Sequence, residues 1–90
     1  MISVNWDLVG FVKRSKNRQK VLDLLETPLT PSDIAKKLEI SLTHASKIVR
    51  ELNSKKLIKC LNENLVMGRI YQRMKDAKKI IDYLSKTKEI

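Results

Sequence analysis

The chain has 90 residues, the length of one small domain, and its 42% hydrophobic residues are enough for one core. No apolar run approaches the length of a membrane span and no signal peptide is apparent, which argues against an integral membrane protein. Cys60 is the only cysteine, so an intrachain disulfide is excluded. A cytoplasmic protein is expected.

Charge indicates the kind of partner. Nineteen Lys and Arg residues against ten Asp and Glu residues give a formal net charge of +9. Such an excess raises the affinity of a protein for polyanions. Nucleic acid is therefore the first partner to consider, and an anionic membrane surface is the second.

The N-terminal part is predicted to be helical. Apolar residues at i, i+4, i+7 and i+8 indicate a helix over residues 4–13, with a stripe of Val4, Leu8, Phe11 and Val12. Trp6 and Val9 fall on another face of this helix, and we expect them to point away from the core. Ser15 can cap a second helix, or re-cap the first, up to about Glu26. Its inward face is predicted to be Val21, Leu22, Leu24 and Leu25.

Cap signals then predict two short helices in succession. Thr30 is a suitable N-cap, Pro31 suits the first helical position, and Asp33 can close a capping box. The buried face of this helix is predicted to be Ile34, Ala35 and Leu38. After a tight connection at residues 39–40, Ser41 caps the next helix. Two short helices joined in this way form a helix-turn-helix unit.

The helix predicted over residues 42–55 has two distinct faces. At about 100° per residue, one face carries Ala45, Ile48, Val49 and Leu52. The opposite face carries two long cations and short hydrogen-bonding side chains, a surface suited to the major groove of DNA. Arg50 can offer a bidentate fork to guanine, whereas Lys47 can neutralise phosphate. The predicted DNA-binding residues are Ser41, Thr43, His44, Ser46, Lys47, Arg50, Ser54 and Arg69.

Residues 57–61 and 69–73 favour two β-strands of a hairpin joined by residues 62–68. A last helix over residues 75–86 has its apolar positions at Ala77, Ile80, Ile81 and Leu84. The expected fold is mainly α with a small β-hairpin, in the order helix, helix, helix, hairpin, helix. Residues 1–90 form a single domain in this interpretation.

Further cations cluster in residues 13–20, where five Lys and Arg side chains lie within eight residues. A solvated helix start and a phosphate clamp explain this cluster equally well. The candidate phosphate contacts outside the DNA-binding set are Lys16, Arg18, Thr30, Ser32 and Lys59.

At this point the residues resemble a known family. Residues 30–58, TPSDIAKKLEISLTHASKIVRELNSKKLI, resemble the helix-turn-helix of small archaeal winged-helix regulators related to the ArsR and MarR groups. The later GRIYQ, residues 68–72, resembles their wing strand. The resemblance covers most of residues 16–73. It implies a winged helix-turn-helix transcription regulator that binds double-stranded DNA as a homodimer, with helix 42–55 in the major groove and the hairpin as the wing.

The chain departs from this family at three places. Lys56 stands where the family usually has Gly, at a helix end that favours a left-handed residue, so mild strain is expected. The segment 62–67, at the wing tip, lacks the Lys and Arg residues that wings usually aim at phosphates. Residues 74–76 replace a more usual Thr-led cap. The apolar wing tip supports an alternative, a winged-helix module that contacts protein or RNA within a larger assembly.

Other functional classes lack their residues. No Ser-His-Asp set, glycine-rich phosphate loop or acid pair is present, so neither an enzyme nor a cofactor or small-molecule site is expected. His44 has neither a second His nor a nearby Cys to complete a metal site. Cys60 is predicted to be a small buried hydrophobe rather than a thiol sensor. Dimerisation is expected to use the terminal helices, 4–13 and 75–86. The alternative is that these two helices pack on each other within one subunit and cover the core.

Overall fold

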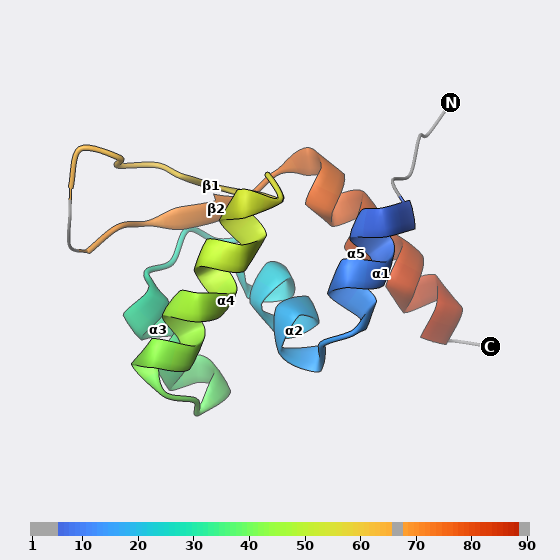
Figure 1. Cartoon of the computed structure of the whole chain (residues 1–90), viewed down its shortest axis with the longest axis horizontal. Coiled ribbons are helices and arrows are strands. Elements are labelled where there is room, and N and C mark those ends of the chain that lie inside the picture. Colours follow the sequence, from blue (N-terminus) through green and yellow to red (C-terminus); the bar gives the residue numbers. More distant parts are fainter. Residues whose placement is uncertain (1–5, 66–67, 89–90) are drawn as a thin grey trace.

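The computed structural model describes residues 6–65 and 68–88, so Val4 lies outside the described residues. This part of the chain forms five helices and one two-stranded hairpin (Figure 1). The elements are α1 (Trp6–Lys13), α2 (Lys16–Leu24), α3 (Pro31–Leu38), α4 (Leu42–Ser54), β1 (Ile58–Cys60), β2 (Tyr71–Arg73) and α5 (Lys75–Lys88). The predicted fold, mainly α with a small hairpin, is confirmed.

The N-terminal apolar stretch forms two helices, α1 and α2, so the structure has five helices where the expected order has four. Ser15 has an extended backbone with φ of −135°, and its hydroxyl accepts a hydrogen bond of 3.3 Å from the Arg18 backbone N–H. This N-cap satisfies one free N–H group at the start of α2, so the chain ends α1 and starts a new helix.

The predicted helix-turn-helix is also confirmed. The Thr30 hydroxyl accepts from the Asp33 backbone N–H at 3.1 Å, and the Asp33 carboxylate accepts from the Thr30 backbone N–H at 3.2 Å. This capping box starts α3 with Pro31 at its first position. Glu39 ends α3 in the left-handed region with φ of 57°, and Ser41 then caps α4. These caps fix the short turn between the two helices.

The core is centred on α2, which contacts α1, α3, α4 and α5. All four predicted inward residues of α4 are buried, as are Val21 and Leu22 of α2 and Leu25 at its C-cap. Leu24, also predicted to face inward, is only half-buried and is not part of the core. The prediction for Val9 has to be corrected. Its side chain is only 5% exposed, so the prediction that it points outward with Trp6 is wrong. Since α2 and α5 both pack against α1, this helix buries more than the single stripe that its periodicity indicates.

The hairpin is joined to the helix-turn-helix by an additional bridge. β1 and β2 pair antiparallel with Cys60 opposite Tyr71. Leu29, in the loop before α3, forms an antiparallel bridge with Tyr71 on the other side of β2, through hydrogen bonds of 3.1 and 2.8 Å. A one-residue bridge has no sequence periodicity, so the sequence did not predict it. Cys60 is half-buried rather than fully buried, and its thiol donates to the Asn62 side chain.

The last helix packs beside the first. In α5, Ala77, Ile80 and Leu84 are buried, and Tyr83 meets Trp6 of α1 edge to face with ring centroids 5.4 Å apart. Figure 1 shows α1 and α5 together at one end of the molecule and the hairpin reaching out at the other. Within the described residues, no helix is long and apolar enough to cross a membrane.

The end of α4 generates a prediction on stability. Lys56 has a positive φ of 60°, and the Lys56 and Leu57 N–H groups donate to the Asn53 and Leu52 carbonyls, which together make a Schellman motif. Because a side chain is strained in this conformation and glycine is not, Lys56→Gly should raise the free energy of unfolding by up to about 1 kcal/mol. Urea denaturation measures it. The matched control, Lys59→Gly in β1, should lower stability instead, and a loss in Lys56→Gly as large as in Lys59→Gly would contradict the strain.

Candidate nucleic-acid interface

One groove brings together three parts of the chain that are far apart in sequence. The start of α3, one flank of α4 and the loop end of the hairpin surround an open hollow of about 860 Å³. Its lining includes six of the predicted site residues: Thr30, Ser32, Thr43, Ser46, Arg50 and Arg69. We call this hollow the main groove. It is the surface at which these six predicted DNA-binding and phosphate-contacting residues converge.

The capping box holds the α3 side of the main groove. The hydrogen bond from the Thr30 backbone N–H, and then the contact with the Thr30 side chain, lower the pKa of Asp33 below its ordinary 3.8. Lys36 and Lys37 add a smaller effect in the same direction. Asp33 therefore stays ionised at neutral pH and fixes the turn that presents Thr30 and Ser32 to the groove.

On α4, the predicted residues divide between the groove and the outer surface. Thr43, Ser46 and Arg50 line the main groove, and the buried stripe of this helix fixes their direction. His44 and Lys47 are exposed but do not line the groove. The two flanking serines, Ser41 and Ser54, are exposed as well, and both hydroxyls bond to the backbone. The Ser41 hydroxyl accepts from the His44 N–H at 3.1 Å, and the Ser54 hydroxyl donates to the Glu51 carbonyl at 2.7 Å.

Arg69 supplies the hairpin side of the main groove. Its Nε donates to the Leu65 carbonyl at 2.6 Å and its Nη2 to the Glu63 carbonyl at 3.4 Å. Nearby, the Asn62 side chain donates to the Gly68 carbonyl and accepts from the Ile70 N–H. These bonds hold the loop that carries Arg69 in the lining of the groove.

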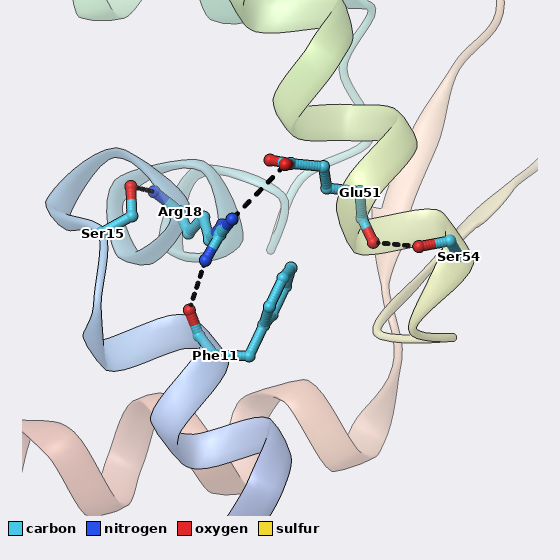
Figure 2. Close-up of polar contacts among 5 residues, drawn as sticks. All are labelled: Phe11, Ser15, Arg18, Glu51 and Ser54. Carbon is cyan, nitrogen blue, oxygen red and sulfur yellow. Dashed lines mark hydrogen bonds and ion pairs between the residues drawn. The ribbon is translucent and has the colours of Figure 1, made fainter.

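Arg18 makes its polar contacts inside the fold, as Figure 2 shows. Its Nη1 donates to the Phe11 carbonyl at 2.8 Å, and its Nη2 lies 3.4 Å from a carboxylate oxygen of Glu51. The guanidinium also stacks on the Phe11 ring, 3.8 Å from the centroid. The side chain is only 18% exposed. Arg18 therefore holds α1, α2 and α4 together, and its predicted contact with phosphate stays a prediction.

The two remaining phosphate candidates lie away from the main groove. Lys16 is exposed at the first position of α2. Lys59 borders a different hollow, together with Lys56, Arg73 and Lys75, where the hairpin meets α5. Neither position is tested as a phosphate contact, so both remain predictions.

Sequence reasoning missed the apolar part of the groove. Leu42 lines the main groove and is 53% exposed, although a helical wheel places it only about 60° from the buried Ala45. Tyr71 and Val49 contribute from the buried side. No local pattern distinguishes an exposed leucine at a helix start from a buried one. Among the residues that the structure describes, no group of three or more His, Cys, Asp or Glu could hold a metal ion.

Comparison with known proteins supports the fold. No family model matches the sequence, and no match was found among curated proteins. A cysteine-to-serine mutant of ZitR from Lactococcus lactis, solved in complex with DNA, aligns with a TM-score of 0.70 and 25% identity over 87% of this chain. The adhesin competence repressor AdcR from Streptococcus pyogenes aligns with a TM-score of 0.69 and 22% identity over 83% of this chain.

A structure of AdcR in its Zn(II)-bound state, described as a zinc-dependent MarR family transcriptional regulator, aligns with a TM-score of 0.59 and 24% identity over 76% of this chain. The aligned parts are 55% of the ZitR chain and 57% and 49% of the two AdcR chains, so this chain spans about half the length of the proteins it matches. The likeness shows a winged helix-turn-helix, with the hairpin in the place of the wing.

The contacts of Arg18 generate a prediction. Arg18→Met keeps the aliphatic stem but removes the charge, so the Phe11 carbonyl loses its donor and Glu51 loses its cation. We expect the free energy of unfolding to fall by about 1–3 kcal/mol. Glu51→Gln should cost less, because its carboxylate is one third exposed and solvent weakens the pair.

The matched control is Lys20→Met, an exposed cation on the same helix, which should change stability by less than about 0.5 kcal/mol. A double-mutant cycle of Arg18 and Glu51, measured by chemical denaturation, isolates their coupling. If Arg18→Met costs no more than Lys20→Met, the guanidinium is solvated and its assignment as an internal tie is wrong.

Proposed function

We propose that this chain is a cytoplasmic, sequence-specific regulator of transcription that binds double-stranded DNA, and not an enzyme. The observation that carries the proposal is the convergence of six predicted contact residues, from α3, α4 and the hairpin, on the main groove. The net charge of +9 suits a polyanionic partner. The similar ZitR structure in complex with DNA supports the same interpretation.

In this proposal α4 enters the major groove. Thirteen residues make a helix about 20 Å long, and the major groove, about 12 Å wide, accepts one α-helix. Arg50 would form paired hydrogen bonds to a guanine edge, with Thr43 and Ser46 beside it. Lys47, exposed next to this row, would neutralise phosphate. Thr30 and Ser32 would contact the backbone from the start of α3, and Arg69 from the hairpin.

We further propose a homodimer that pairs through the terminal helices. In Figure 1, α1 and α5 lie at the end of the molecule opposite the hairpin, so pairing there leaves the main groove free. Trp6 is 64% exposed and Tyr83 is 38% exposed. A two-fold dimer would address two half-sites one helical turn, about 34 Å, apart. The finer family assignment, to an ArsR-like and archaeal group, remains a proposal from the sequence resemblance.

One observation favours a second function, a module that contacts protein or RNA. Leu61, directly after β1, and Leu65, in the hairpin loop, are 46% and 50% exposed. Phosphates do not attract such side chains, whereas an apolar protein surface does. Binding measurements on several nucleic acids separate the two functions.

Binding to duplex DNA should fall steeply with salt. If each dimer neutralises roughly five to eight phosphates, the logarithm of the association constant should fall with the logarithm of salt concentration with a slope of about −4 to −7. Fluorescence anisotropy with random duplex DNA, duplex RNA and single strands at matched salt measures this slope. A slope near zero, or no duplex binding at about 50 mM salt, would refute the DNA proposal.

Substitutions of two cations of α4 test its role in the same assay. Lys47→Ala should weaken binding to all duplexes evenly and reduce the slope by about one. Arg50→Ala should cost about 1–3 kcal/mol on a specific site and relax the preference at one base position. Unchanged affinity in both variants would show that α4 is not the recognition helix.

The dimer has its own test. Light scattering at tens of micromolar protein should give about twice the 10.4 kDa of one chain. Trp6→Glu combined with Tyr83→Glu should give the monomer, because two carboxylates would have to be desolvated at the interface. Lys78→Glu, an exposed position of α5, serves as the control for added negative charge, and circular dichroism checks that each variant is folded. A wild-type mass near 10.4 kDa would contradict the dimer.

A further inference from the structure

Leu42 is an apolar side chain in the middle of a polar recognition surface. It is the first residue of α4 and is 53% exposed. Of the large hydrophobic side chains that are exposed in residues 6–65 and 68–84, it alone lines the main groove. Its neighbours in the lining include Thr43, Ser46 and Arg50.

The start of α4 does not require a leucine. The Ser41 hydroxyl already accepts from the His44 N–H, so the helix is capped without any contribution from Leu42. The first turn of a helix favours an acidic side chain, through the helix dipole. An acidic side chain would repel DNA phosphates, which explains its absence, but a small polar residue would serve at this position without such repulsion. Neither helix capping nor the helix dipole therefore accounts for an exposed leucine.

We propose that Leu42 contacts the C5-methyl group of a thymine in the major groove and helps to determine the recognised sequence. The inference rests on the proposed function and deepens it. Donors and acceptors occupy the major-groove edges of adenine, guanine and cytosine, whereas thymine presents a methyl group beside its acceptor. A leucine side chain can neither donate nor accept a hydrogen bond, so this methyl group is its matching contact in unmodified DNA.

The spacing along α4 places this thymine near the proposed guanine contact. Leu42 and Arg50 are eight residues apart, about 12 Å along the helix axis. Because the major groove runs obliquely to the DNA axis, at about 3.4 Å per base pair this distance covers at most three or four steps along DNA. Both contacts therefore fall within one half-site, so each half-site contains a thymine and a guanine a few base pairs apart.

The test removes only the methyl group. Binding sites are selected from a random duplex library, and each thymine of the selected duplex is then replaced in turn by uracil, which pairs identically but lacks the C5-methyl group. For wild-type protein, one such replacement in each half-site should weaken binding about fourfold, the effect of one lost methyl contact. Leu42→Ala and Leu42→Gln should bind the thymine and uracil duplexes equally. Gln keeps nearly the length of the side chain but not its apolar character.

Lys47→Ala is the matched control, since it should bind more weakly overall but retain the full preference for thymine. Equal binding of every uracil duplex by wild-type protein would overturn the inference while leaving DNA binding intact. A preference for thymine that persists unchanged in both Leu42 variants would also overturn it. Failure of wild-type protein to bind any duplex would overturn the proposed function itself, and this inference with it.

Discussion

Ala45, Ile48, Val49 and Leu52 anchor α4 in the core, and none of these side chains is more than 3% exposed. Burying a valine, isoleucine or leucine side chain stabilises a fold by about 1.5–3 kcal/mol. Rotating α4 by one residue, about 100°, would expose part of this stripe and turn cations or hydroxyls toward the core. The direction of every exposed side chain on α4, and with it the composition of the main groove, depends on this one buried face.

Arg18 secures the same helix from its other flank. Glu51 is the only acid on α4, and its carboxylate faces the guanidinium of Arg18 rather than the groove (Figure 2). The pair leaves Arg50 without a competing acid on its own helix. Since Arg18 also bonds to the Phe11 carbonyl, α1 and α4 are fixed relative to each other. The terminal helices and the groove thus form one connected unit, although they lie at different ends of the molecule.

The sequence predicted best where local chemistry decides the structure. The capping box at Thr30, the cap at Ser41 and the buried face of α4 follow from neighbouring residues, and all were confirmed. Contacts over long separations were missed. Arg18 meets a residue 33 positions away, Leu29 bridges β2, and Val9 is buried where other helices pack on α1. Hydrophobic periodicity predicts only one buried face of one helix or strand. It therefore predicts neither a second packing partner nor an exposed leucine such as Leu42.

The central claim is that the main groove is the surface that binds DNA. The most direct measurement is a titration of ¹⁵N-labelled protein with duplex DNA, followed by NMR. If the main groove binds DNA, the largest chemical-shift changes should fall on residues that line it, among them Ser32, Thr43, Ser46, Arg50 and Arg69, while the amides of α5 should change little. Shifts concentrated instead on the hollow around Lys59 and Lys75, with the main groove unaffected, would contradict it.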